Sequence, residues 1–340
     1  MNLKGEEDRA SAGLAPGAAD RDYRDLFALA PDAYLVTDGQ TIIAESNQAA
    51  AAMLKMDRGC LQGKPLTHFV AEADRPAFQV NLIQIREGGE KCNWEFRLQS
   101  GQDAPFPVSA NVSAQTDHRD QLVRVLWLLR DVSEGKAEAD RLKSLLKGIK
   151  SSFHGIVEAV ASAVEIKDPQ TAGHQRRVAQ LAVAIARELG FSLNRLEGIR
   201  VAGLLHDIGK IAVPMEILNK PGELSQLECE FIKSHCQIGF DLLKNIDFPW
   251  PVLPAILQHH ERLDGSGYPA GLTDKDIILE ARILGVADVV EAMICTRSYG
   301  PAQGIDQALE EIHQKGGILY DPEVVNVCLK LFVEKGFCFN

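Results

Sequence analysis

Residues that could ligate metal ions are concentrated in one part of this 340-residue sequence. Five of its nine histidines fall between residues 174 and 260. The pair His206-Asp207 is followed by Lys210 in LLHDIGKI, and on a helix these three side chains would face one side. Imidazole and carboxylate groups suit a divalent transition metal, and a carboxylate can bridge two ions. Since an ammonium group cannot ligate a metal, we expect Lys210 to contact a phosphate.

Further candidate ligands flank a glycine-rich turn. His259 and His260 are adjacent, and because helical neighbours point about 100° apart, both can reach one cluster where a helix ends. The following segment DGSGYPAG supplies such an ending, since glycine permits positive φ and proline restrains the residue before it. Asp288 lies in the apolar segment ARILGVADVVEAM, where a buried carboxylate needs a partner such as a metal. Any one histidine is more often structural, but the whole set, with His174 and His235, predicts a metal centre.

The elements that must position these residues are mostly helical. From about Phe153 onward the sequence predicts an all-α unit, with helices at residues 176–188, 193–206, 225–244, 250–260 and 278–293. A linker helix is expected over residues 135–163. Its apolar residues follow the 3.5-residue period of a coiled coil, namely Leu142, Leu146, Ile149, Phe153, Ile156, Val160 and Ala163. We favour a parallel dimer through this seam, and the alternative is one amphipathic helix packed on its own domain.

Residues 23–132 alternate short strand-like runs with helical pieces. Ala33–Thr37 reads as a strand that ends at the turn Asp38-Gly39, and Asn47 lies where a helix N-cap is expected. Later strand-like runs cover residues 92–98, 106–112 and 122–129. Two early and three late strands predict an α+β sheet domain. Residues 1–21 mix charge with alanine and glycine, which predicts a disordered tail and not a secretory signal.

The composition excludes several classes of protein. A formal charge of -11 disfavours nonspecific binding to nucleic acid, which needs a basic field. No apolar run reaches the roughly 18 residues that span a bilayer. The seven cysteines are odd in number and form no CxxC pair. We therefore expect a cytoplasmic protein with reduced thiols.

Residues 22–134 resemble a PAS domain, through LFALAPDAYLVTD, AESNQAAAAML and LRDVSEGK. The resemblance implies a sensor or dimerisation module whose ligand is unknown, and which regulates the C-terminal unit through the linker helix. His68 and His118 are the two histidines of this segment that could ligate a haem. A lone histidine is more often a surface or packing residue, so haem is not the expected ligand.

Residues 154–336 resemble an HD-GYP domain. The motifs that carry the resemblance are HDIGKIAVPMEILNKPGEL, HCQIGFDLL, HHERLDGSGYPAGL and RILGVADVVEAM. We expect the domain to extend to residue 340. HD-GYP proteins are phosphodiesterases of the HD superfamily that hydrolyse cyclic di-GMP to pGpG or GMP. The resemblance implies two divalent ions, iron or manganese, that activate water for in-line attack on phosphorus. It implies catalytic roles for Asp207 and Lys210. Position by position, it implies a first metal site at His174, His206, Asp207 and Asp288. It implies a second metal site at His235, His259 and His260, with Asp207 as the bridge between the two. The implied substrate contacts are Lys210, Arg297, Gly267, Tyr268 and Pro269.

Three positions depart from the family pattern. Gln170 stands where some members carry a glutamate that helps to hold a third metal, so two ions are expected. Glu291 stands where an aspartate is common, with the charge kept. Gly300 replaces a basic residue, which should weaken substrate binding more than chemistry. Two alternatives stay open: a catalytically weak module that binds cyclic dinucleotides or docks signalling proteins, and an enzyme for a mixed GMP–AMP ring.

Overall fold

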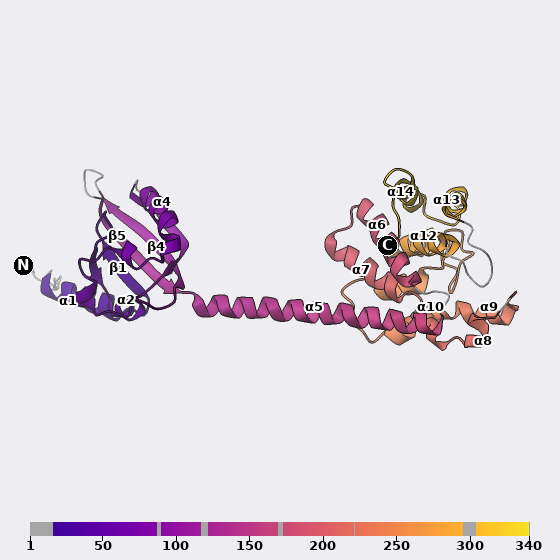
Figure 1. Ribbon diagram of the computed structural model, residues 1–340, viewed down its shortest axis with the longest axis horizontal. Helices are drawn as coiled ribbons and strands as arrows, with labels where there is room; N and C mark the ends of the chain where they lie inside the picture. Colours follow the sequence, from indigo (N-terminus) through magenta and orange to yellow (C-terminus); the bar gives the residue numbers. More distant parts are fainter. Residues whose placement is uncertain are drawn as a thin grey trace, which may run out of the picture. The chain divides into compact units, whose positions relative to one another are not determined.

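The computed structural model describes residues 16–86, 90–116, 122–168, 173–220, 222–294 and 304–339. The chain divides into two compact units, Met1–Leu146 and Lys147–Asn340 (Figure 1). Each unit has its own hydrophobic core, so each is treated by itself. The expectations for His118, Gln170, Arg297 and Gly300 concern positions outside the described residues.

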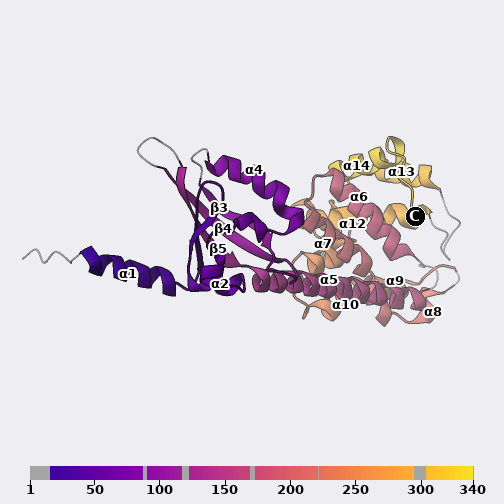
Figure 2. The same ribbon diagram turned by 60° about the vertical axis from the view of Figure 1, so that its left-hand side comes forward.

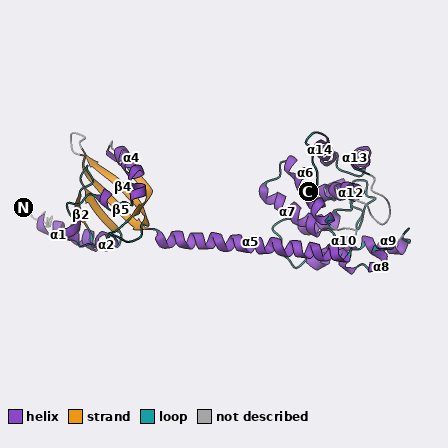
Figure 3. Ribbon diagram, in the orientation of Figure 1, coloured by secondary structure: helices purple, strands orange, loops and turns teal. Residues whose placement is uncertain are grey.

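The first unit is built on a five-stranded antiparallel sheet in the order β2-β1-β5-β4-β3 (Figure 3). The early strands pair with each other, and β1 also pairs with the last strand, which brings the two ends of the domain together. The predicted α+β sheet domain is confirmed. The strands are β1 (Ala33–Thr37), β2 (Ile43–Ser46), β3 (Lys91–Leu98), β4 (Phe106–Thr116) and β5 (Leu122–Asp131).

Four helices accompany this sheet, namely α1 (Pro16–Leu29), α2 (Gln48–Met53), α3 (Arg58–Leu61) and α4 (Arg75–Arg86). The predicted cap is present, because the Asn47 side chain accepts a hydrogen bond from the Ala50 amide at 2.9 Å. Residues 16–21 were expected in the tail, but α1 begins at Pro16. Proline at a first helical position is favourable, since its missing N–H would have no partner there.

Aromatic side chains fill the core of the first unit. The Phe78 ring, from α4, stacks on Trp94 with centroids 4.7 Å apart and on Trp127 at 5.8 Å. The Trp127 indole donates a hydrogen bond to the buried Thr37 hydroxyl at 3.0 Å. His68, by contrast, is exposed on the surface. The core is therefore held by ring packing, and His68 lies outside it.

The second unit consists of helices joined by loops, and its described residues contain no strand (Figure 2). The predicted all-α architecture is confirmed. Central to it is α12, which is buried over most of its length and packs against α6, α7, α11, α13 and α14. The helices are α5 (Ser133–Lys167), α6 (His174–Glu188), α7 (Leu193–Leu205), α8 (Met215–Leu218), α9 (Gln226–Lys233), α10 (His235–Leu243), α11 (Val252–Gln258), α12 (Leu279–Ile294), α13 (Ile305–Gln314) and α14 (Pro322–Val333).

The helix predicted over residues 225–244 is two helices that meet at Ser234. The Ser234 hydroxyl donates to the Phe231 carbonyl oxygen at 2.6 Å, a local bond that competes with the helical pattern. The helix predicted over 193–206 ends at Leu205, and a 3-10 turn, Ile208–Ala212, follows. Both breaks place a histidine at a helix end, His206 after α7 and His235 at the start of α10.

α5 is a continuous helix of 35 residues whose second half packs on the second unit. Val157, Ala161 and Val164 are buried in that core, and Phe153 and Val160 pack against it. Phe153 and Val160 of the seam thus pack on the helix's own domain, as the alternative expected, and the parallel dimer stays a prediction. The rest of the predicted seam is exposed, with side-chain exposures of 57% for Leu142, 57% for Leu146, 66% for Ile149 and 63% for Ile156.

The cysteines that the structure describes are all free. Cys236 and Cys328 are buried, whereas Cys60, Cys92 and Cys338 are exposed. No described helix combines the length and apolar character that crossing a membrane requires.

Candidate metal centre

The seven predicted ligands lie together in the second unit, although they come from separate elements. Every histidine of the set stands at or just past a helix end, where the chain turns toward the centre. All are buried except His260, which is half-buried. His174 begins α6, His206 and Asp207 follow α7, His235 begins α10, His259 and His260 follow α11, and Asp288 lies inside α12.

The ligand atoms form two neighbouring groups. Those of His174, His206 and Asp288 lie within 4.8 Å of one another, and so do those of His235, His259 and His260. Asp207 lies between the groups. Its Oδ2 is 3.5 Å from His206 Nε2 and 3.6 Å from His174 Nε2. Its Oδ1 is 3.4 Å from His235 Nε2, so one carboxylate oxygen faces each group.

Three histidines share one hydrogen-bond arrangement. The Nδ1 atoms of His206, His235 and His259 lie 2.6–2.7 Å from the carbonyl oxygen three residues earlier. Because a carbonyl only accepts, each Nδ1 carries the proton and each Nε2 keeps its lone pair. The Nε2 of His206 is buried and has no hydrogen-bond partner among the described residues. Buried, orphaned lone pairs of this kind are suited to a cation, so the residues present fit a metal.

Burial sets the protonation of these rings. It lowers the pKa of His206, His235 and His259, and it lowers that of His260 to about 3. The buried environment penalises the charged imidazolium and favours the neutral ring. Neutral imidazole is the form that ligates metals.

The carboxylates of the centre remain ionised. Burial raises the pKa of Asp207, but the Lys210 ammonium and the surrounding imidazoles outweigh it and hold that pKa well below the usual range. Asp288 behaves in the same way through its contact with His174, whose Nε2 is 3.2 Å from Asp288 Oδ1. Burial lowers the pKa of His174, but its hydrogen bonds to Asp288 and Glu291 prevail and raise it to about 9. Anionic oxygens beside the neutral rings of His206, His235, His259 and His260 make a cation-binding site.

Two family models match this chain. Residues 158–324 match the HD domain, and residues 31–134 match the PAS domain. The chain thus joins a PAS domain to an HD domain. All seven candidate ligands fall within the residues that match the HD domain.

Curated relatives are similar to about half of this chain's length. The cyclic di-GMP phosphodiesterase response regulator RpfG of Xanthomonas campestris pv. campestris is 38% identical over 192 residues, which cover 56% of this chain and 51% of RpfG. A cyclic di-GMP phosphodiesterase of Thermotoga maritima is 42% identical over 178 residues, which cover 52% of this chain and 48% of that protein. The 3'3'-cGAMP-specific phosphodiesterase 3 of Vibrio cholerae is 39% identical over 169 residues, which cover 49% of this chain and 36% of that protein. The chain thus spans about half, or less, of each relative's length.

Lys210 lies beside the ligand cluster of the HD domain. Its ammonium group donates to Asp207 Oδ2 at 2.6 Å, and its side chain is 13% exposed. Asp207 caps the 3-10 turn that contains Lys210, in place of the α-helix that we expected, but their spacing of three still places both on one side. Lys210 is therefore held at the edge of the centre, with its cationic group against the Asp207 carboxylate.

The glycine-rich turn packs directly on the second histidine group. The Tyr268 ring stacks on His260 with centroids 4.7 Å apart. Gly267 lies so close to the chain at residues 260–262 that a Cβ there would be 2.4 Å from Arg262 N. The Glu261 carboxylate accepts hydrogen bonds from the amides of Ala270, at 2.7 Å, and Leu272, at 2.9 Å. The buried Glu261 therefore clamps the turn beside His260, a role that the sequence analysis missed.

Glu291 is a second residue whose role the sequence analysis missed. Its side chain is 1% exposed, and its carboxylate contacts His174 Nδ1 and accepts a hydrogen bond from Arg177 Nε at 2.7 Å. Glu291 thus orients His174 with Nε2 toward the centre. The available signal was its spacing, since it follows Asp288 by three residues and shares a helix face with it.

Proposed function

We propose that this protein is a metal-dependent phosphodiesterase that hydrolyses cyclic di-GMP to pGpG or GMP in its HD domain. One observation carries the proposal: Asp207 presents one oxygen to each of two buried histidine groups, with the Lys210 ammonium 2.6 Å away. Two relatives named as cyclic di-GMP phosphodiesterases support the substrate. Because another relative is named as a cGAMP-specific phosphodiesterase, the mixed GMP–AMP ring is the competing candidate substrate.

The donor set fits two divalent ions, and we propose iron or manganese. The first would be held by His174, His206, Asp207 and Asp288, and the second by His235, His259 and His260, with Asp207 shared. Ions in these positions supply Lewis acidity to the phosphodiester and to the attacking water. Gln170, whose amide argues against a third ion, lies outside the described residues, so the number of ions stays a prediction.

The chain's own residues would bind and orient the substrate. Lys210 would donate to a phosphoryl oxygen and stabilise the charge that develops there. Gly267, Tyr268 and Pro269 would contact the nucleotide, a role supported by the stacking of the Tyr268 ring on His260. Arg297 stays a predicted contact to phosphate or guanine, because it lies outside the described residues.

The decisive experiment pairs metal analysis with product chromatography. We expect the purified protein, loaded with iron or manganese, to convert cyclic di-GMP to a linear product. Replacing both His206 and Asp207 with alanine should abolish metal content and hydrolysis together. The matched control is Asp241→Ala, which removes an exposed carboxylate on α10 that pairs with Lys244 at 3.0 Å.

Three other results would change the conclusion. Hydrolysis retained by the double variant would contradict the proposed centre. Faster turnover of 3'3'-cGAMP than of cyclic di-GMP would reassign the substrate. Metal and dinucleotide binding without turnover would support the alternative of a binding or docking module for signalling proteins.

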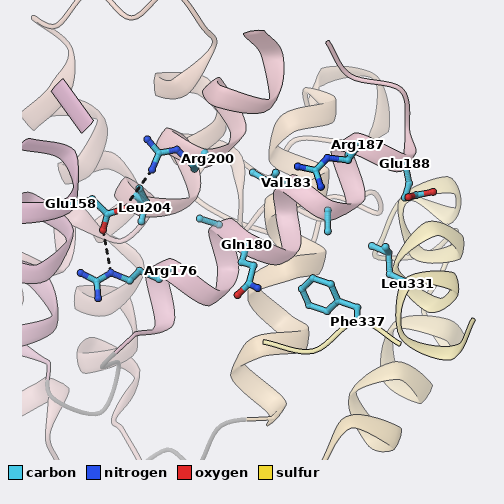
Figure 4. Close-up of a pocket in the computed structure, with 12 residues that line it drawn as sticks. Glu158, Arg176, Gln180, Val183, Arg187, Glu188, Arg200, Leu204, Leu331 and Phe337 are labelled. Carbon is cyan, nitrogen blue, oxygen red and sulfur yellow. Dashed lines mark hydrogen bonds and ion pairs between the residues drawn. The ribbon is translucent and has the colours of Figure 1, made fainter. Parts of the chain in front are cut away.

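We further propose that the PAS domain regulates the HD domain through α5, whose second half contacts two ligand-bearing helices. Glu158 of α5 lies between Arg176 of α6, at 3.1 Å, and Arg200 of α7, at 3.5 Å, on the rim of a pocket of about 550 Å³ (Figure 4). α6 begins with His174, and His206 follows α7. A shift of α5 therefore has a direct route to the first ligand group.

The test of this regulation is a deletion of residues 1–134. The second unit has its own core, so the truncated chain retains the packing that positions the ligands. We expect altered turnover, because α5 would lose the domain that biases its position. Unchanged turnover and an unchanged oligomeric state would contradict the regulatory role.

A further inference from the structure

Cys236 lies inside the second ligand group. It follows His235 in α10, and its side chain is fully buried. Its Sγ and the ring nitrogens of His235, His259 and His260 all lie within 4.8 Å of one another. The group therefore contains four potential donor atoms, and one of them is sulfur.

Two of the separations between these atoms match those of ligands that share one ion. Bond lengths of about 2.3 Å to sulfur and 2.0–2.1 Å to nitrogen place two such atoms about 3.6 Å apart at a tetrahedral angle. Cys236 Sγ is 3.5 Å from His235 Nε2. The Nε2 atoms of His235 and His259 are 3.4 Å apart, close to the value expected for two nitrogens on one ion.

The histidines show independently that this position suits a cation. The Nδ1 protons of His235 and His259 are engaged with carbonyl oxygens, so their Nε2 lone pairs are directed toward the space that Sγ also borders. We propose that Cys236 is a further protein ligand, as a thiolate, of the ion held by His235, His259 and His260 and shared by Asp207. This inference rests on the proposed metal centre. Coordination would release the thiol proton to solvent.

A thiolate would make the two ion positions chemically different. The first group offers nitrogen and oxygen donors from His174, His206, Asp207 and Asp288. The second would add a soft sulfur donor, which favours iron(II), cobalt(II) or zinc over manganese(II). We therefore expect the second position to discriminate against manganese more strongly than the first.

The test uses the full chain, reduced and reconstituted with cobalt(II) in the absence of oxygen. We expect a thiolate-to-cobalt charge-transfer band in the near ultraviolet, and its loss in Cys236→Ser and Cys236→Ala. Cys328→Ser is the matched control, because Cys328 is also fully buried in the same unit but lies on α14. The control variant should keep the band.

The outcomes separate this inference from the proposed function. Two bound cobalt ions without a charge-transfer band in the unmodified protein would overturn the thiolate ligand and leave the phosphodiesterase proposal intact. Failure to bind cobalt, iron or manganese would overturn both. The measurement on the unmodified protein decides the question even if a Cys236 variant does not fold.

Discussion

Glu291 and Lys210 are charged residues that act on the centre in different ways. Glu291 is buried behind His174 and holds the ring in place. Lys210 lies at the edge of the centre, where its ammonium pairs with Asp207, and in the proposed function it would also contact the substrate phosphate. Replacing the first should therefore change metal affinity, whereas replacing the second should change turnover.

Glu291→Gln should weaken metal binding about 10- to 100-fold, the usual effect of removing a hydrogen-bond partner of a metal-ligating histidine. Metal titration of the stripped protein measures this. The matched control is Glu280→Gln on the same helix, where Glu280 pairs with Arg195 at 2.7 Å away from the ligands. Unchanged metal affinity in Glu291→Gln would show that Glu291 does not support His174.

Lys210→Ala should lower kcat about 10²- to 10³-fold, as expected for loss of a group that stabilises charge in the transition state. Metal content should be retained, because an ammonium group is not a ligand. Lys220→Ala is the control, since Lys220 pairs with Glu228 at 2.7 Å outside the centre. An unchanged kcat would remove Lys210 from the proposed chemistry.

At the scale of elements, close approach of backbone positions the ligands. Gly209 lies in the 3-10 turn after Asp207, and a Cβ there would be 1.9 Å from the carbonyl oxygen of His235. Gly285 of α12 similarly lies against the His259 carbonyl oxygen, which a Cβ would approach to 2.7 Å. These glycines let segments that carry different ligands touch directly.

Gly209→Ala should separate the 3-10 turn from α10 and destabilise the second unit by roughly 1–3 kcal/mol, the range for overpacking. The Asp207-to-His235 spacing would widen, so metal content should also fall. The control is Gly155→Ala in α5, where a Cβ meets nothing within 4 Å. Because alanine has a higher helix propensity than glycine, Gly155→Ala should raise the free energy of unfolding by about 0.5–1 kcal/mol. Thermal unfolding measures both, and equal effects would contradict the packing argument.

At the scale of the whole molecule, we propose that α5 pairs with a second copy of the chain. Leu142, Leu146 and Ile149 are more than half exposed, and they keep the coiled-coil spacing over the part of α5 that precedes Phe153. Burying them in a parallel dimer would remove apolar surface from water, worth roughly 25 cal/mol for each Å². The half-buried Phe153 and Val160 would contribute less, because they already pack on the second unit.

Ile149→Glu should shift the protein toward monomer, since it places a charge in the seam and like charges would face each other. Sedimentation equilibrium measures the change in association. Lys147→Glu is the control, an exposed position on α5 outside the seam. A protein that is monomeric before any substitution would refute the dimer outright.

Much of the fold was predictable because its signals are local. Hydrophobic period, turn residues and caps such as Asn47 depend on neighbours in the chain, and they located four of the five strands and several of the helices. The break at Ser234 was missed because one hydroxyl-to-carbonyl bond outweighed a continuous helical pattern. The clamp by Glu261 was missed because its partners, nine and eleven residues away, show no periodic signal.

The sequence by itself determined which residue types could ligate metals and that His206, His259 and His260 lie near helix ends, since spacing and turn chemistry are local properties. Only the tertiary structure decided that Asp207 faces both histidine groups, that Glu291 contacts His174 and that Cys236 joins the second group. These contacts bring together residues up to 117 positions apart. Their distances depend on how α6, α7, α10, α11 and α12 pack, which no local pattern specifies.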